Sequence, residues 1–321
     1  MKKLFIIIVL IITFCGCSAR IDHNEPIPSD VFSSHETNSP TQITAAANTI
    51  STTQKSAQKT IPKTTVSQPD KNPSQTTDAN IHKGDLILIN RENKYNYWDN
   101  PHLVNIYANK NKTYTVGNTD MKANGYVLKA FNSLMSDFDS RPGENHINII
   151  SAYRSLEYQK TLFENKVKKT NETEADKWLA RSGHSEHHSG LAIDLGLYKN
   201  KTAKEFDGKG NYAWVGENCH KYGFIIRYTD EKEPITKIND EPWHLRYVGV
   251  AHAYYMKENN LCLEEYVEKL RSYNYDLRLK IQAAGKNYEV YYTQKTDAQI
   301  PKSGNYEISG NNIDGFIVTI G

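Results

Sequence analysis

The hydrophobic pattern divides the chain into three parts. Residues 4–14 form a nearly continuous apolar run near the N-terminus. From residue 18 to about residue 82 large aliphatic and aromatic residues are rare, and Ser, Thr, Gln, Asn, Pro and Ala dominate. Such a segment cannot bury enough apolar surface to fold, so residues 18–82 are predicted to be a disordered linker. From residue 83 onward apolar residues recur with the spacings of helices and strands, which predicts one folded region.

The folded region mixes both spacings without a regular strand–helix–strand alternation. Val127, Ala130, Phe131 and Leu134 share one face of a predicted helix, and Ser155 suits the N-cap of another. Predicted helices cover residues 121–138, 155–168, 171–180, 214–222, 250–259 and 263–273, and predicted strands cover residues 86–90, 146–152, 190–195, 224–228, 243–248, 288–292 and 316–320. This order predicts an α+β fold with a central, mostly antiparallel sheet flanked by helices.

The predicted elements favour one main domain and one extension. We place the main domain at residues 83–273 and a β-rich C-terminal extension at residues 274–321. The extension either adds strands to the core or forms a small separate β module. The main domain is long enough to bury a hydrophobic core of its own, so a metal ion is not needed to hold it together.

The N-terminus reads as an export signal, assigned to residues 1–17. Lys2 and Lys3 precede the apolar run, which is shorter than the roughly 20 residues of a membrane-spanning helix. Cys17 follows Gly16 and resembles the acylated cysteine of bacterial lipoprotein signals, with a simple cleaved signal as the alternative. We therefore expect an extracytoplasmic protein, anchored to the cell membrane through a lipid on Cys17.

Net charge and cysteine content bear on what class of protein this is. The net charge of +2, from 39 basic and 37 acidic residues, argues against a nucleic-acid binder. Only Cys219 and Cys262 remain after the leader, and in an oxidising compartment they could form a disulfide. A buried free cysteine, which behaves as a small apolar side chain, is the ordinary explanation for each of them. We expect the protein to be a monomer.

Metal-ligand chemistry is concentrated in two segments, GHSEHHSGLAID at residues 183–194 and EPWHLRY at residues 241–247. A catalytic zinc ion takes three protein ligands and keeps one open position, and His187, Asp194 and His244 supply such a set. Gly190 permits a bend between His187 and the strand that carries Asp194. Without a bend the two side chains would face opposite sides of a strand.

Glu241 stands three residues before His244, where its carboxylate would lie beside the metal and could act as a general base. Each assignment has a plainer alternative. His184 or His188 could replace His187 as a ligand, Asp194 could cap a turn, and Glu241 could belong to a solvated acidic loop.

The two segments resemble the signature of the VanY-type D-alanyl-D-alanine carboxypeptidases, whose relatives include the VanX-type D,D-dipeptidases. The matching residues are Ser185, His187, Gly190, Ala192, Asp194, Glu241 and His244. The similarity also takes in residues 151–155, Gln159 and residues 222–228, and covers about residues 84–272. The resemblance implies one zinc ion per chain, held by His187, Asp194 and His244, with Glu241 as the catalytic base.

The resemblance also assigns substrate contacts. Arg154 matches an arginine near the substrate, and its guanidinium suits a bidentate pair with the carboxylate of a terminal D-residue. A buried ion pair is the alternative role for Arg154. Gln159 and Ser185 match positions near the substrate peptide, and Trp243 is expected to pack beside the site.

The implied activity is removal of the C-terminal D-alanine from peptidoglycan stem peptides that end in D-Ala-D-Ala. L,D-carboxypeptidase or D,D-dipeptidase action would use the same residues, and a non-catalytic wall-binding lipoprotein is the alternative from another class. Glycopeptide resistance and ordinary wall trimming would also use the same residues, so the sequence does not separate these two roles.

Overall fold

The computed structural model describes residues 81–96 and 102–321. The export signal at residues 1–17, Cys17 and all but the last two residues of the linker at residues 18–82 lie outside the described residues, and they stay predictions. Within the described part of the chain, no helix combines the length and the apolar character that a membrane crossing requires.

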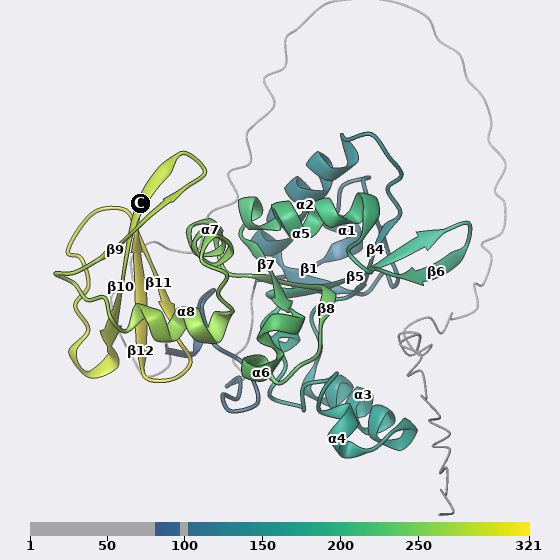
Figure 1. Cartoon of the computed structure of the whole chain (residues 1–321), viewed down its shortest axis with the longest axis horizontal. Helices are drawn as coiled ribbons and strands as arrows, with labels where there is room; N and C mark the ends of the chain where they lie inside the picture. The colour runs from purple at the N-terminus through teal and green to yellow at the C-terminus, as the bar shows by residue number, and fades with distance from the viewer. Residues whose placement is uncertain (1–80, 97–101) are drawn as a thin grey trace, which may run out of the picture. The chain divides into compact units, whose positions relative to one another are not determined.

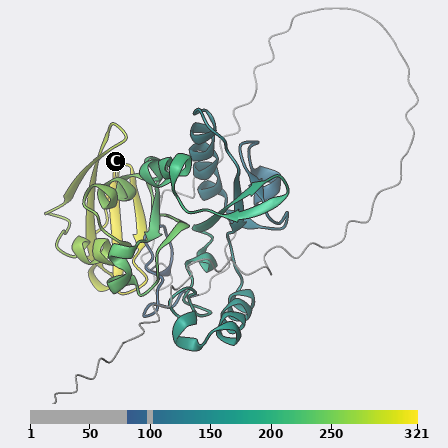
Figure 2. The ribbon, with the colours of Figure 1, turned by 45° about the vertical axis from the view of Figure 1, so that its right-hand side comes forward.

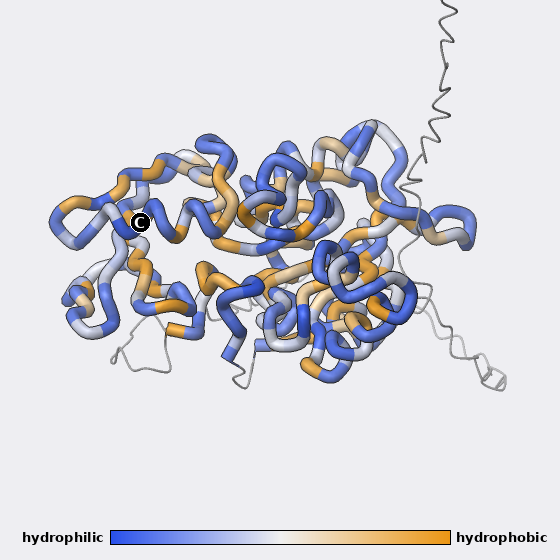
Figure 3. The backbone as a smooth tube through the Cα atoms, turned by 60° about the horizontal axis from the view of Figure 1, so that its bottom comes forward, coloured by the Kyte–Doolittle hydropathy of each residue, from blue (hydrophilic) through white to orange (hydrophobic). Residues whose placement is uncertain are grey.

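A six-stranded sheet forms the centre of the main domain. Its strands are β2 (Thr115–Val116), β4 (Ile147–Ser151), β5 (Ala192–Lys199), β6 (Thr202–Glu205), β7 (Phe224–Tyr228) and β8 (Glu241–Tyr247). The order is β2-β4-β5-β8-β7, with β6 paired to β5. Only β2 and β4 run parallel, which confirms the predicted mostly antiparallel sheet. The tip of the β5–β6 hairpin is hydrophilic (Figure 3).

Helices and a separate two-stranded antiparallel sheet accompany the central sheet. The remaining elements of this region are β1 (Leu103–Asn105), β3 (Lys122–Asn124), α1 (Ile106–Asn109), α2 (Gly125–Asp139), α3 (Leu156–Lys169), α4 (Glu172–Ala175), η3 (Glu186–Ser189), η4 (Gly210–Tyr212), α5 (Ala213–Asn218), η5 (Cys219–Tyr222), η6 (Asp230–Lys232) and α6 (Glu233–Thr236). The apolar face of α2 packs in one core cluster with Ile149, Ile193 and Leu245 of the sheet. Ser155 caps α3 as predicted, because its hydroxyl accepts a hydrogen bond from the Tyr158 backbone amide.

The segment at residues 86–90 was predicted as a strand, and that prediction is wrong. Its side chains do alternate, with Leu86 and Leu88 in one core cluster and Ile87 and Ile89 in another. The segment joins no ladder, however, because side chains take its carbonyl groups: Arg246 donates to the Ile87 carbonyl at 2.9 Å. The predicted helix at 171–180 is also shorter than expected and ends with α4.

The C-terminal extension forms a sheet of its own. Its strands are β9 (Leu279–Ala283), β10 (Lys286–Gln294), β11 (Tyr306–Gly310) and β12 (Gly315–Ile320), in the order β11-β12-β10-β9, and η7 is Lys295–Asp297. It shares a core cluster with α7 (Val250–Glu258) and α8 (Leu263–Leu270), which lie beside it in both ribbon views (Figure 1, Figure 2). The extension therefore adds no strand to the central sheet, but its side chains share a hydrophobic core with α7 and α8.

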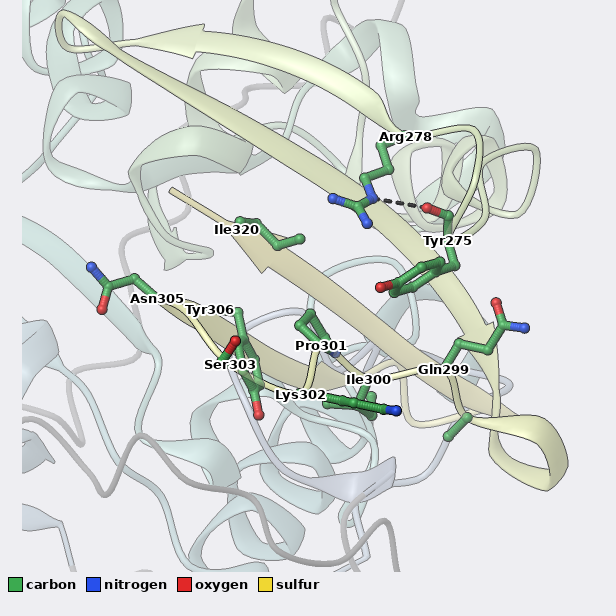
Figure 4. Close-up of a pocket in the computed structure, with 11 residues that line it drawn as sticks. Tyr275, Arg278, Gln299, Ile300, Pro301, Lys302, Ser303, Asn305, Tyr306 and Ile320 are labelled. Atoms are coloured by element: carbon green, nitrogen blue, oxygen red, sulfur yellow. Dashed lines mark hydrogen bonds between the residues drawn. The ribbon is translucent and has the colours of Figure 1, made fainter.

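The C-terminal sheet carries a cavity of about 790 Å³. Tyr275, Arg278, Lys302 and Tyr306 are among its lining residues, and Figure 4 shows Arg278 donating to the Tyr275 carbonyl. The Arg278 charge is neutralised by Glu289 at 2.9 Å. None of the predicted metal ligands lines this cavity.

The two cysteines are both free and buried. Cys219 lies in η5, and Cys262 is the N-cap of α8. Both cysteines fill buried space, and the Cys262 side chain also caps α8 by accepting a hydrogen bond from its first turn. The disulfide alternative is not realised in the structure.

His252 links α7 to the C-terminal sheet. Its burial leads us to expect that the free energy of unfolding depends on pH. Its ring nitrogens contact the Tyr266 hydroxyl at 2.7 Å and the Thr319 hydroxyl at 3.0 Å. Burial lowers the pKa of His252 to about 3. The unfolded chain, with a pKa near ~6.5, binds the proton more readily. The stability contribution is therefore complete above pH ~6.5 and is lost as the pH falls toward 3.

At pH 5 this loss amounts to about 2 kcal/mol relative to neutral pH. Urea unfolding of the wild type and of His252→Gln at both pH values measures it. The wild type is expected to lose more unfolding free energy than the variant, because glutamine does not titrate. An equal loss in both proteins would contradict this assignment.

Candidate active site

The predicted ligands converge because two neighbouring strands and one tight bend bring them together. Asp194 on β5 and His244 on β8 are direct partners in an antiparallel ladder, so both side chains project from the same face. His187 lies in η3, immediately before β5. Gly190 ends η3 with a φ of 72°, the left-handed conformation that favours glycine, and so provides the predicted bend.

The three side chains are buried, and the Asp194 carboxylate lies between the two imidazole rings. Asp194 Oδ2 is 3.0 Å from His187 Nε2, and Asp194 Oδ1 is 3.0 Å from His244 Nδ1. One ligand atom from each residue lies within 4.8 Å of the others, an arrangement that could hold a metal ion. The structure thus brings the three predicted ligands together.

A hydrogen bond behind the site determines which nitrogen of His187 can bind a metal ion. His187 Nδ1 lies 2.5 Å from the Ala152 carbonyl oxygen. A carbonyl can only accept, so Nδ1 carries the hydrogen and Nε2 is left as the ligand atom. Burial and the nearby Arg154 charge lower the pKa of His187 to about 4, so this imidazole is neutral at neutral pH, as a metal ligand must be.

A divalent cation fits these donors. Asp194 Oδ1 is buried and accepts no hydrogen bond from the described residues. Burial would raise the pKa of Asp194, but the effect of burial is outweighed by His187, which is protonated in the acidic range where carboxylates titrate, and by the Arg154 charge, so the pKa of Asp194 stays well below its usual value. Two imidazole nitrogens and one carboxylate oxygen form a donor set typical of catalytic zinc. Zinc is therefore the cofactor that the site fits.

Glu241 reaches the site because β8 bulges. Ile226 of β7 pairs with Leu245, whereas Tyr228 pairs with Glu241, so a step of two residues along β7 corresponds to a step of four along β8. This irregularity, which includes Pro242, turns Glu241 toward the same side as His244. Glu241 Oε2 lies 3.6 Å from His244 Nδ1. Burial raises the pKa of Glu241 to about 8. The carboxylate is buried beside the metal ligands, not in a solvated loop.

Arg154 follows β4, the strand next to β5 in the sheet, and reaches the ligand cluster at Asp194. Its Nη2 donates to Asp194 Oδ2 at 2.5 Å, Nε donates to the Ser151 hydroxyl at 2.7 Å, and Nη1 donates to Gln159 Oε1 at 3.2 Å. The side chain is 11% exposed. The ion-pair alternative is thus realised, with a predicted metal ligand as the partner. One N–H on each terminal nitrogen has no acceptor among the described residues.

Gln159 and Ser185 lie behind the site. Gln159 is fully buried, and its amide also donates to the Ala180 carbonyl at 2.6 Å. Ser185 caps η3, and its hydroxyl accepts from the His187 amide at 3.4 Å. Gln159 thus supports the Arg154 guanidinium and Ser185 supports the backbone of His187, and the predicted contact of both residues with the substrate stays a prediction. Trp243 is half-buried against the core cluster that contains α2, and its packing beside a substrate stays a prediction.

The neighbouring histidines are excluded as ligands by their own partners. His188 accepts a hydrogen bond from the Gly183 amide at Nε2, and its Nδ1 lies 2.8 Å from the Arg154 carbonyl. His184 Nδ1 lies 2.9 Å from the Asn90 carbonyl. Both therefore hold the loop in place, and His187 alone of the three faces Asp194 and His244.

Sequence reasoning missed a buried charge network behind His244. Glu186 and Arg246 are fully or almost fully buried and lie 2.6 Å apart, and Arg227 lies 2.8 Å from the same Glu186 oxygen. Burial would raise the pKa of Glu186, but the charges of Arg246 and Arg227 hold it below its usual value. The sequence did contain a signal for this network, because Arg227 and Arg246 each stand inside an otherwise largely apolar strand, β7 and β8.

Comparisons with known proteins agree with this geometry. The family model described as VanY, D-alanyl-D-alanine carboxypeptidase, matches residues 120–250. A D-alanyl-D-alanine carboxypeptidase of Enterococcus faecium is 34% identical over 76% of this chain and 77% of its own length. A bifunctional D-Ala-D-Ala dipeptidase and carboxypeptidase of Enterococcus gallinarum, VanXYC, is 35% identical over 40% of this chain and 69% of its own length.

A solved structure resembles the fold over most of its length. It is the vancomycin resistance D,D-dipeptidase VanXYg in complex with a D-Ala-D-Ala phosphinate analog, with a TM-score of 0.67 and 33% identity. The match covers 75% of this chain and 95% of that chain. The similarity thus extends from the metal-ligand segments to the arrangement of the whole domain.

Proposed function

Since the chain belongs to the VanY family of D-alanyl-D-alanine carboxypeptidases, and is therefore a peptidase, we propose that it removes the C-terminal D-alanine from peptidoglycan stem peptides. One observation carries the proposal. The three presumed ligands, a buried carboxylate at Glu241 and the guanidinium of Arg154 meet at one point of the sheet.

His187 Nε2, His244 Nδ1 and a carboxylate oxygen of Asp194 would hold the zinc ion. When bound, zinc supplies a Lewis acid that polarises a carbonyl group and lowers the pKa of water. Burial of all three ligands keeps the local dielectric low, which strengthens the interaction of the site with developing negative charge.

Glu241 provides the proton transfers. Its carboxylate lies next to the ligand cluster and belongs to no ion pair with an arginine or a lysine among the described residues. It can accept a proton from the attacking water and later give it to the departing amine. The bulge in β8 holds it at the required side of the strand.

Arg154 provides selection for a chain end. Three of its N–H groups are used by Ser151, Gln159 and Asp194, which fixes the plane of the guanidinium. The N–H groups left on Nη1 and Nη2 are suited to a terminal carboxylate. Arg154 thereby links the ligand Asp194 to the substrate.

Replacing Arg154 by lysine tests this role. Lysine keeps the charge but not the planar fork, so kcat/KM for a peptide ending in D-Ala-D-Ala is expected to fall about 10- to 100-fold. The wild type should strongly prefer the free acid over the C-terminal amide, and the variant should lose much of that preference. Arg181→Lys, at an exposed ion pair, is the matched control. An unchanged acid-to-amide ratio would refute the contact.

The substrate itself is tested with three peptides and mass spectrometry. The purified protein is incubated with a stem pentapeptide ending in D-Ala-D-Ala, with the tetrapeptide, and with free D-Ala-D-Ala, each with and without a zinc chelator. We expect chelator-sensitive release of D-alanine from the pentapeptide. Release from the tetrapeptide alone would replace the proposal by L,D-carboxypeptidase action, and release from none would favour a binding protein.

D,D-dipeptidase action is the second candidate, favoured by the similarity to VanXYg, a D,D-dipeptidase. Both activities need the same ligands, base and guanidinium. They differ in whether the site accepts the rest of the stem peptide. Cleavage of the free dipeptide at a higher kcat/KM than the pentapeptide would favour this candidate.

A further inference from the structure

The buried carboxylate of Glu186 lies directly behind a presumed metal ligand. Its Oε2 is 3.3 Å from His244 Nε2, the nitrogen that faces away from Asp194. Its Oε1 accepts hydrogen bonds from Arg227 Nε at 2.8 Å and from Arg246 Nη1 at 2.6 Å. The Glu186 side chain is 0% exposed, so no solvent competes for these contacts.

The two arginines fix the orientation of this carboxylate. Arg227 also donates to both oxygens of Glu264 on α8, at 2.9 and 2.7 Å. Arg246 donates to the backbone carbonyls of Asp85 and Ile87 at 3.0 and 2.9 Å. With Oε1 held between two guanidinium groups, Oε2 is left to face His244.

We infer that Glu186 is a positioning residue, which makes His244 present Nδ1 to the metal. An ionised carboxylate only accepts hydrogen bonds, so His244 Nε2 must carry the hydrogen that it donates. Nδ1 then offers its lone pair toward Asp194 and the metal. Carboxylates that orient ligating histidines in this way raise metal affinity. The inference rests on the proposed ligand role of His244.

Glu186→Gln separates this role from simple packing, because glutamine has the same shape. The two arginines attract the amide oxygen, so the amide nitrogen of the glutamine would face His244 Nε2. Two hydrogen-bond donors then oppose each other whenever Nδ1 is on the metal. Glu264→Gln is the matched control, since it removes a carboxylate from the same network without contact to His244.

The experiment measures zinc affinity of the full chain and both variants by competition with a chromophoric chelator. We expect Glu186→Gln to bind zinc about 10- to 100-fold more weakly and Glu264→Gln to stay within about twofold of the wild type. Thermal melting verifies that each protein is folded. An unchanged affinity in folded Glu186→Gln, or an equal loss in both variants, would overturn the inference.

A second measurement needs no variant. In the zinc-loaded wild type with nitrogen-15 histidine, NMR is expected to show His244 bound through Nδ1 and a slowly exchanging hydrogen on Nε2. Coordination through Nε2, or free exchange of that hydrogen, would refute the role of Glu186 even if Glu186→Gln does not fold. Neither readout uses a substrate, so a failure of the proposed peptidase specificity would be seen separately.

Discussion

Replacing Glu241 by glutamine is expected to reduce kcat for D-alanine release by about 10²- to 10⁴-fold while zinc stays bound. The amide keeps the size of the side chain but cannot accept a proton from water or return it to the leaving amine. The three presumed ligands, His187, Asp194 and His244, are untouched by the change. The measurements are release of D-alanine from a pentapeptide and zinc content by atomic emission.

The control for this prediction is Glu217→Gln, which changes an exposed carboxylate on α5. It is expected to keep both zinc and activity. Full turnover by Glu241→Gln would show that another group moves the proton. Loss of zinc from Glu241→Gln would instead show that Glu241 acts as a ligand.

The ligand set could be predicted from sequence because metal chemistry restricts the choice so strongly. Few residue types bind zinc, and Gly190 marks the one bend that lets His187 and Asp194 converge. The same motif register separated His187 from His184 and His188. The structure supports that choice through the partners that occupy the other two rings.

The supporting residues could not be predicted, because their partners are distant in the chain. Glu186 contacts Arg227 and Arg246, which are 41 and 60 positions away. No local spacing encodes such a contact. The complete burial of Gln159 beside Arg154 likewise follows only from the packing of α3. Sequence patterns thus point to residues with metal-ligand chemistry more readily than to the long-range contacts that support them.

The fold shows the same limit. The apolar alternation at residues 86–90 correctly predicted burial on both sides of the segment, yet Arg246 and Asn312 take the carbonyls that a neighbouring strand would need. The strand at Phe224–Tyr228 was predicted at its observed ends because glycine and polar residues flank it. Pairing partners, which decide whether an extended segment becomes a strand, are not visible in local periodicity.

Asp194→Asn is expected to lower zinc binding and to bring D-alanine release down to the level of the chelator-treated wild type. The amide removes the only anionic ligand of the set, and it also ends the charge pairing with Arg154 at 2.5 Å. An uncompensated guanidinium would then lie beside the metal position and repel the cation. Zinc titration and peptide cleavage of this variant, with the exposed Asp120→Asn as the control, measure the effect. Zinc affinity equal to that of the wild type would show that the carboxylate serves Arg154 alone, and the ligand set would have to be reassigned.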